Sequence, residues 1–184
     1  MKIAIFDVET TGLLMPSVAP IEKQPHIIEL GGLVVDENGE IRELSQLLDP
    51  QVELEQVITK ITGIKPEDLQ NKPTFEEFLP QLREFFDGTD VFMAHNAPFD
   101  SGVLRCELER LSADFPWPEE IICTVQEYTP QFGHRPKMTE LYEKVMGKPL
   151  LQTHRALDDV RALYECTKED GFLNMLFGIG NDSA

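Results

Sequence analysis

The chain has 184 residues, which is enough for one domain with a substantial hydrophobic core. Asp and Glu number 33 against 16 Lys and Arg, so the formal net charge is −17, and 41% of the residues are hydrophobic. This hydrophobic fraction excludes a disordered acidic tail and indicates a folded domain with an acidic surface. Taken alone, the charge argues against a general nucleic-acid binder, whose surface is usually basic.

Neither a membrane span nor a disulfide framework is expected. The sequence has no run of about 18 apolar residues, and its N-terminus lacks the small-residue cleavage site of a signal peptide. Cys106, Cys123 and Cys166 are odd in number and widely spaced, which favours buried thiols over disulfides or a cysteine-based zinc site. We therefore expect a cytoplasmic protein in a reducing compartment.

The first third of the chain is predicted to be rich in strands. Residues 3–8 form a short run of branched apolar side chains, and residues 27–35 and 41–48 are predicted as two strands joined by a hairpin turn at Asn38-Gly39. Residues 14–25, between the first two strands, contain three prolines and are predicted to form a surface loop.

Helical periodicity begins after residue 70. Thr74 and Glu77 have the spacing of a capping box, and the apolar residues of the segment 75–86 follow at helical intervals. Three further helices and two strands are predicted, the helices at 100–112, 139–146 and 155–168 and the strands at 91–94 and 121–125. This order predicts one α/β domain with a mixed sheet, antiparallel at the opening hairpin and parallel where strands return through helices.

Acidic side chains stand where predicted strands end. Asp7 and Glu9 are two residues apart, so both carboxylates project from the strand face that carries Ile3 and Ile5. Two like charges in such a place repel each other unless a cation lies between them, although a solvated strand end also explains this pair alone. Gly12 then allows the backbone to turn close to the same point.

Two more acids and a histidine stand near predicted helix starts. Asp100 follows the strand at 91–94 and by itself is typical of a helix N-cap. Five residues along a helix correspond to about 140°, so His154 shares a cleft with Asp159 only if His154 lies just before the helix; by itself Asp159 is explained equally well as a solvated acid. Four acids and one histidine would suit Mg²⁺ or Mn²⁺, which prefer oxygen ligands, better than Zn²⁺.

Three short motifs carry a resemblance to a known family. The segments IFDVETTGL, HNAPFD and HRALDD resemble the signature motifs of the DEDDh 3'-5' exonucleases, a group similar to proofreading epsilon subunits. The resemblance covers nearly the whole chain and includes ITGI at 61–64 and CTV at 123–125. A related group with a tyrosine in place of the histidine would have Tyr at the position of Arg155, so the histidine type is the match.

The resemblance implies a ribonuclease H-like fold, with a mixed five-stranded sheet flanked by helices. It implies one exonuclease domain over residues 1–170. The C-terminal tail at 171–184 is apolar enough to pack on the domain or on a partner, and packing on the domain is favoured. The implied activity is metal-dependent hydrolysis of nucleic acid from the 3' end, with DNA as the expected substrate and nucleoside 5'-monophosphates as products.

The same resemblance assigns roles to the motif residues. Asp7 would bridge two divalent ions, Mg²⁺ or Mn²⁺. Glu9 and Asp159 would ligate one of these ions, and Asp100 would hold the other directly or through water. His154 would be the general base, so activity should fall at acid pH as this base becomes protonated.

Further residues are expected to contact the terminal nucleotides: Thr10, Thr11, Gly12, Leu13, His95, Asn96 and Phe99. Leu13 and Phe99 would wedge against the bases, although a core position is an equal alternative for these two. Glu29 interrupts an apolar strand and is either a buried acid near the metals or half of a salt bridge. The loop 14–25 is expected to border the cleft and to influence which 3' ends fit.

Two alternatives remain open from the sequence. RNA trimming by the same chemistry is one, because no residue separates DNA from RNA. An acidic protein that imitates nucleic acid is the other, but such a protein has no need of these residues in motif.

The charge is unevenly distributed. Residues 131–157 carry a net charge of +3 and the rest carry −20, and repulsion from distant acids is screened beyond about 8 Å at physiological salt. We therefore expect weak, metal-dependent binding of a single-stranded or frayed 3' end, with a separate polymerase chain as a candidate partner and no membrane association.

Overall fold

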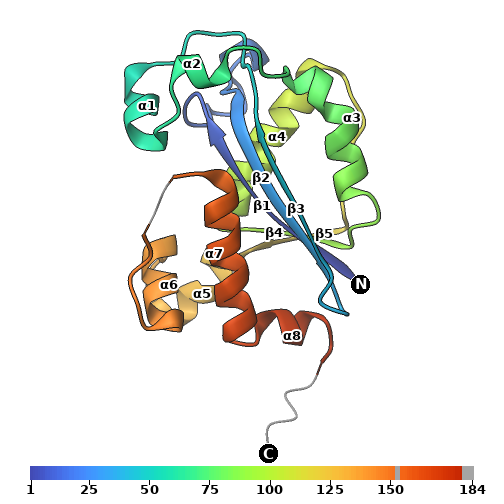
Figure 1. Ribbon diagram of the computed structural model, residues 1–184, viewed down its shortest axis with the longest axis vertical. Coiled ribbons are helices and arrows are strands. Elements are labelled where there is room, and N and C mark those ends of the chain that lie inside the picture. The colour runs from blue at the N-terminus through green and yellow to red at the C-terminus, as the bar shows by residue number, and fades with distance from the viewer. Residues whose placement is uncertain (152–153, 180–184) are drawn as a thin grey trace, which may run out of the picture.

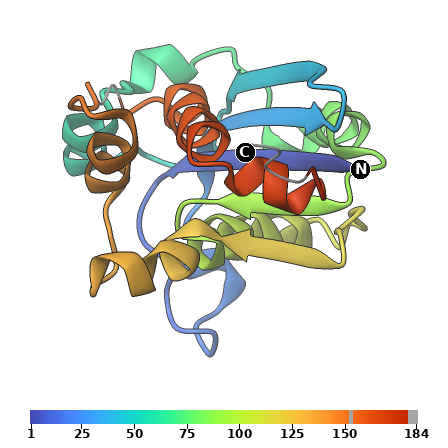
Figure 2. The same cartoon turned by 90° about the horizontal axis from the view of Figure 1, so that it is seen from below.

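The computed structural model describes residues 1–151 and 154–179. One sheet contains five strands in the order β3-β2-β1-β4-β5, and Figure 2 shows them stacked in this order. The strands are β1 (Lys2–Thr10), β2 (Ile27–Asp36), β3 (Ile41–Leu47), β4 (Val91–Ala94) and β5 (Glu120–Cys123). The first three pair antiparallel, whereas β4 lies parallel to both β1 and β5. The predicted mixed five-stranded sheet is confirmed.

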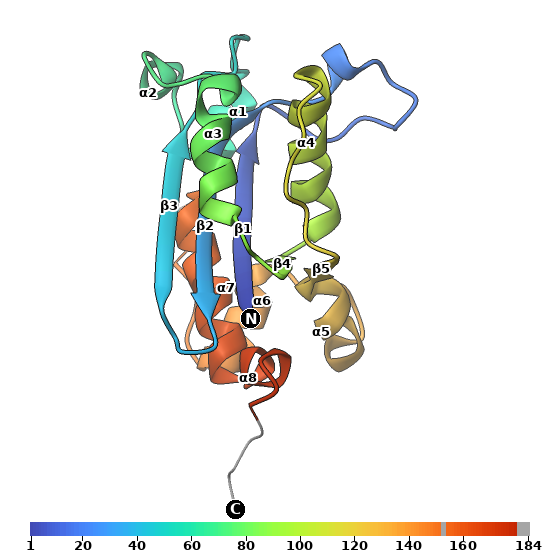
Figure 3. The same ribbon diagram turned by 90° about the vertical axis from the view of Figure 1, so that its right-hand side faces the viewer.

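Helices cover both faces of this sheet (Figures 1 and 3). They are η1 (Ile21–Lys23), α1 (Gln56–Thr62), α2 (Pro66–Leu69), α3 (Phe75–Phe86), α4 (Ala97–Arg110), α5 (Thr124–Phe132), α6 (Met138–Met146), α7 (Ala156–Glu169) and α8 (Phe172–Leu176). One hydrophobic core lies between the sheet and helices α3 and α4, and a second lies between the opposite face and helices α5 to α8. Because β2 is covered on both sides, nine of its ten residues are buried.

Helix α3 forms as its sequence predicts. The Thr74 hydroxyl accepts the Glu77 N–H at 3.3 Å, and the Glu77 carboxylate accepts the Thr74 N–H at 2.9 Å. This capping box satisfies two polar groups at the helix start, while the apolar stripe of α3 is buried against Phe6 and Phe92 in the first core. The predicted helix at 75–86 is therefore confirmed residue for residue.

Predicted element boundaries differ from the observed ones by up to three residues. Helix α4 begins at Ala97, three residues before the predicted start, with Asn96 as its N-cap, so Asp100 is not an N-cap. Pro98 is tolerated in the first turn because its missing N–H would have no helical partner there. The predicted strand at 121–125 ends at Cys123, where its pairing with β4 ends, and helix α5 starts at Thr124.

Helices α1, α2, α5 and α8 were not predicted. The first two are short and rich in residues that do not favour helices, and a small separate core of Ile28, Leu54, Ile64 and Leu69 holds them against β2. Helix α8 lies against α7, and its Leu173 is buried there. Residues 180–184 of the predicted tail lie outside the described residues.

The cysteines and the helix lengths bear on two further predictions from the sequence. Cys106 is half-buried, Cys123 and Cys166 are buried, and all three are free thiols. Among the described residues, no helix combines the length and the apolar composition that a membrane crossing needs.

Candidate active site

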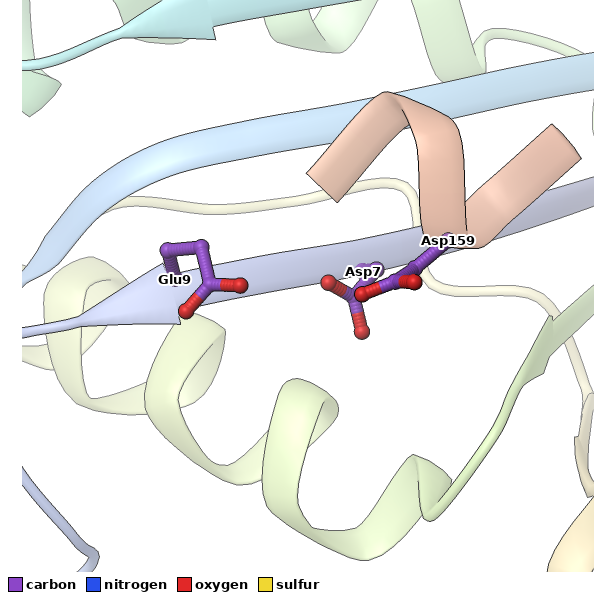
Figure 4. A group of neighbouring side chains, drawn as sticks. All are labelled: Asp7, Glu9 and Asp159. Carbon is purple, nitrogen blue, oxygen red and sulfur yellow. The ribbon is translucent and has the colours of Figure 1, made fainter. Parts of the chain in front are cut away.

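The last residues of β1 carry an acidic cluster. Pairing of β1 with β4 covers Ile3 to Ile5, whereas pairing with β2 continues to Thr10, so the end of β1 projects beyond its parallel neighbour. Asp7 and Glu9 point from the face that α7 covers, and Asp159 of α7 approaches them from above the strand (Figure 4). Carboxylate oxygens of these three residues lie within 4.8 Å of one another.

A glycine on β2 permits this approach of α7. Gly31 is the cross-strand partner of Asp7. A Cβ atom at Gly31 would lie 2.4 Å from the backbone carbon of Ala156 and 2.4 Å from the backbone nitrogen of Leu157. No side chain fits at that distance, so the absence of a Cβ lets the first turn of α7 rest on the sheet and deliver Asp159 to Asp7.

Asp100 lies beside the cluster, at the open edge of β1. Its side chain is 2% exposed, and its Oδ1 accepts the Val8 N–H at 3.2 Å, beyond the last residue that β4 pairs. Burial, and then the charge of Asp7, raise the pKa of Asp100 well above its ordinary value. Of the described residues, neither Asp100 nor His154 contributes an atom to the three-carboxylate cluster itself.

The cluster is electrostatically costly when no cation is bound. Burial and the nearby charge of Asp159 raise the pKa of Asp7 from 3.8 to about 7. Burial and the charge of Asp7 raise the pKa of Glu9 from 4.5 to about 8. A divalent cation among the carboxylates would offset this repulsion, and three converging oxygen donors are the type of ligand that Mg²⁺ and Mn²⁺ prefer. The donor set therefore fits a hard divalent ion.

His154 lies directly before α7, in the arrangement that the sequence left open. Arg155 is the N-cap of that helix, and His154 precedes it with a φ of 51°, in the left-handed region. The imidazole is exposed to solvent. This placement puts His154 and Asp159 at the same end of α7, five residues apart.

Glu29 forms a salt bridge, which is one of the two roles that the sequence left open for it. It also lies next to the acidic cluster. It is completely buried, and Arg155 donates to it from Nε at 3.0 Å and from Nη2 at 2.6 Å. The backbone N–H of Ala156 is a further donor at 3.2 Å. Glu29 is the cross-strand partner of Glu9, and its charge contributes to the raised pKa of both Asp7 and Glu9.

The residues after β1 form a tight turn. The Thr10 hydroxyl donates to the Gly12 carbonyl at 2.7 Å, and the Thr11 hydroxyl accepts the His26 N–H at 2.9 Å. Gly12 has open space around the position of a Cβ. Leu13 is 81% exposed, which excludes the core alternative for this residue.

The second motif connects to the loop before α6. The Nε2 of His95 lies 3.1 Å from the Pro136 carbonyl, and its Nδ1 lies 3.0 Å from the Thr124 hydroxyl. A carbonyl only accepts, so Nε2 carries a proton, and burial lowers the pKa of His95. Asn96 is exposed, with a φ of 82°, and accepts a hydrogen bond from Arg135 at 3.1 Å.

His95 lies in a cavity with two of the acids, whereas Phe99 packs against the first core. His95, Asp7 and Asp159 line one small cavity of about 60 Å³. Phe99 is half-buried and packs against the first core. Arg135 was not among the predicted site residues, because only the fold brings it to Asn96, although the net positive charge of its segment was a usable signal.

The loop 14–25 is fixed to α4 and lies outside that helix in Figure 3. The Gln24 side chain binds the backbone N–H and carbonyl of Met15 at 3.0 and 3.2 Å. Arg110 of α4 donates to the carbonyls of residues 21, 24 and 25 at 3.1, 2.6 and 3.1 Å. Its guanidinium is in turn bound by Glu107 at 2.9 Å. The loop therefore has a defined position.

The fold and the sequence of this chain match those of nucleases. The chain belongs to the exonuclease family RNase_T, which matches residues 4–167. It is 32% identical over 163 residues to the DNA polymerase III subunit epsilon of Treponema pallidum, covering 87% of this chain and 72% of that protein. It is 31% identical over 164 residues to the PolC-type DNA polymerase III of Clostridium perfringens, covering 89% of this chain but only 11% of that much longer protein.

A solved structure confirms the fold. The nuclease domain of 3'hExo, a DEDDh family member bound to rAMP, superposes with a TM-score of 0.73 at 20% identity, covering 92% of each chain. The ribonuclease H-like fold that the sequence implied is thus confirmed, and the family match shows that the class of enzyme is an exonuclease.

Proposed function

We propose that this chain removes nucleotides from the 3' end of DNA and releases nucleoside 5'-monophosphates, using two divalent ions and a histidine base. The observation that carries this proposal is the convergence of Asp7, Glu9 and Asp159 within 4.8 Å in a chain of the exonuclease family. Asp100, buried beside them, completes the four acids of the three motifs.

The four acids would hold the divalent ions in this proposal. Asp7, at the centre of the cluster, would contact both ions, while Glu9 and Asp159 would hold one of them and Asp100 the other. When bound, the ions supply positive charge to the attacking and leaving oxygens of an in-line displacement at phosphorus. Because the pKa values of Asp7 and Glu9 are raised, ion binding near neutral pH would displace protons from these carboxylates.

The imidazole of His154 takes the proton of the attacking water in this proposal. Its exposure allows the proton to pass on to solvent after each cycle. The position of His154 just before α7 is consistent with this role, because the same helix start carries Asp159.

The terminal nucleotide would lie against the turn after β1 and the start of α4. Leu13 offers an exposed apolar surface for a base, and the open space at Gly12 allows close approach of the backbone. Arg135 offers a cation for the phosphate backbone from a loop that His95 anchors. Thr10 and Thr11 hold the turn after β1 and Asn96 holds Arg135. Phe99 packs against the first core.

DNA is favoured as substrate because the relatives are DNA polymerase III proteins. One of them is named as a subunit, which supports a separate polymerase chain as partner. RNA is the second candidate, because the similar solved nuclease domain was captured with rAMP.

The decisive experiment is digestion of 5'-labelled oligonucleotides of equal sequence, single-stranded and duplex, as DNA and as RNA. Each is incubated with Mg²⁺, with Mn²⁺ or with a chelator. We expect shortening from the 3' end, faster on single-stranded DNA, with metal only. Faster digestion of RNA than of DNA would make RNA the substrate. The metal-dependent reaction would be refuted if Asp7→Ala were as active as wild type, or if wild type were as active in chelator as in Mg²⁺.

A further inference from the structure

The buried ion pair between Glu29 and Arg155 lies next to the acids without belonging to them. Glu29 is 0% exposed, whereas the Arg155 side chain is 46% exposed, so the pair extends from the sheet to the surface. Both guanidinium nitrogens Nε and Nη2 donate to the carboxylate, between 2.6 and 3.0 Å. Such a two-point contact fixes orientation as well as distance.

The same carboxylate also holds the backbone of α7. Its Oε2 accepts the Ala156 N–H at 3.2 Å, and Ala156 is the first residue of the helix. The Arg155 carbonyl accepts the N–H groups of Asp158 and Asp159 at 2.9 and 3.1 Å. Arg155 therefore begins the helix with its backbone and ties the helix to β2 with its side chain.

The backbone of His154, just before the Glu29 contacts with Arg155 and Ala156, needs to be held in place. His154 has a φ of 51°, a left-handed conformation that residues other than glycine adopt at a cost. An exposed residue in this conformation has other backbone states available unless its neighbours fix it. The contact of Glu29 begins one residue later, and the close approach at Gly31 keeps the helix on the same spot.

We propose that Arg155 and Glu29 are positioning residues, which together set the backbone direction at His154 and the place of Asp159 over Asp7. Arg155 also places a positive charge on Glu29, the cross-strand partner of Glu9, and so opposes the effect of the Glu29 charge on Glu9. This inference rests on the proposed function, because it gives the pair a role in that reaction.

Three variants test the role: Arg155→Ala, Glu29→Gln and the double variant. Arg155→Ala leaves a buried carboxylate without its partner and should lower the Tm, whereas the double variant removes that charge and should recover much of the Tm. If the pair positions the site, the double variant stays slow, with kcat on a single-stranded oligonucleotide reduced roughly 10- to 100-fold and KM within about twofold of wild type. The calorimetric Kd for Mn²⁺ should weaken about tenfold in the same variant.

Arg161→Ala is the matched control, because Arg161 forms a similar two-point ion pair with Glu43 on the exposed part of the same helix, at 2.9 and 2.6 Å. It should keep both kcat and the Kd for Mn²⁺. Recovery of kcat together with Tm in the double variant would overturn the inference and leave a purely structural pair. An inactive wild type that binds Mn²⁺ would refute the proposed function instead, and the Kd values would still decide the positioning role.

Discussion

Gly31 stands directly opposite Asp7 in the β1–β2 pair, and the backbone of α7 occupies the space that a side chain at Gly31 would need. The acidic cluster therefore depends on a residue that has no functional group. Asp7 and Glu9 are brought together by the period of one strand, but Asp159 joins them only because α7 reaches the sheet at this glycine.

Gly31→Ala should therefore damage the site although Gly31 has no side chain that could bind an ion. A methyl group 2.4 Å from the Ala156 carbon must displace α7, which we expect to cost about 2–4 kcal/mol of stability. Chemical denaturation measures this cost, and calorimetry should show a weaker Kd for Mn²⁺.

Gly32→Ala is the comparison for that variant. A Cβ at Gly32 would lie 2.8 Å from the Phe85 ring on the opposite face of the sheet. It should lower stability without changing the affinity for Mn²⁺. Equal effects of the two substitutions on this affinity would contradict the account of Gly31.

The acidic cluster should make the metal-free protein less stable as the pH rises. Asp7 and Glu9 hold their protons to about pH 7 and pH 8 in the folded chain, whereas in the unfolded chain they lose them near their ordinary pKa values of 3.8 and 4.5. Between these limits the folded state binds more protons, so the contribution of these groups to stability is complete below pH 4 and is lost as the pH rises through 7 and 8.

Asp7→Asn tests this sign. In chelator the variant should have a higher Tm than wild type at alkaline pH, by roughly 3–8 °C, and a similar Tm at acid pH. Addition of Mg²⁺ should raise the Tm of wild type more than that of the variant, because only wild type keeps the full ligand set. Parallel Tm curves for the two proteins across this pH range would contradict the raised pKa of Asp7.

His154→Gly should separate chemistry from folding. Glycine adopts a φ of 51° without strain and the imidazole is exposed, so the Tm should be unchanged or slightly higher. Loss of a general base should reduce kcat roughly 10²- to 10⁴-fold. Added imidazole should restore part of the rate in this variant but not in Asp7→Asn, and near-normal kcat without imidazole would exclude His154 as the base.

Arg135→Ala should weaken binding of the substrate backbone. Its guanidinium is exposed and lies against Asn96 of the second motif. We expect a higher KM with little change in kcat, and a slope of log KM against log salt concentration that is smaller by about 0.7 for one lost phosphate contact on single-stranded DNA. Arg161→Ala removes the same charge elsewhere and should leave the slope unchanged; a matching change there would mean that net charge alone acts.

The features that local sequence patterns predicted depend on residues that are close together along the chain. Helix α3 follows from its capping box and apolar period, and the shared face of Asp7 and Glu9 follows from the two-residue repeat of a strand. These depend on neighbours along the chain. The motif resemblance added Asp100, Asp159 and His154, which periodicity could not have connected.

What sequence could not supply depends on contacts between distant segments. The partner of Glu29 is Arg155, 126 residues away, and the need for glycine at position 31 exists only because α7 crosses there. Helix α5 begins with Thr124 and Val125, which favour strands, but the strand ends where its partner β4 ends. Helix α1 relies on its packing with Ile64 and Leu69 more than on its own composition.

The central claim is that the half-buried acids Asp7, Glu9 and Asp159, with the buried Asp100, hold divalent ions for hydrolysis at a 3' end. The most direct measurement is the time course of a 5'-labelled single-stranded DNA with wild type and with Asp7→Asn, each in Mg²⁺ and in chelator. The account predicts a ladder shortening from the 3' end, with nucleoside 5'-monophosphates as products, for wild type in Mg²⁺ only. Shortening of the same kind by folded Asp7→Asn, or by wild type in chelator, would contradict it.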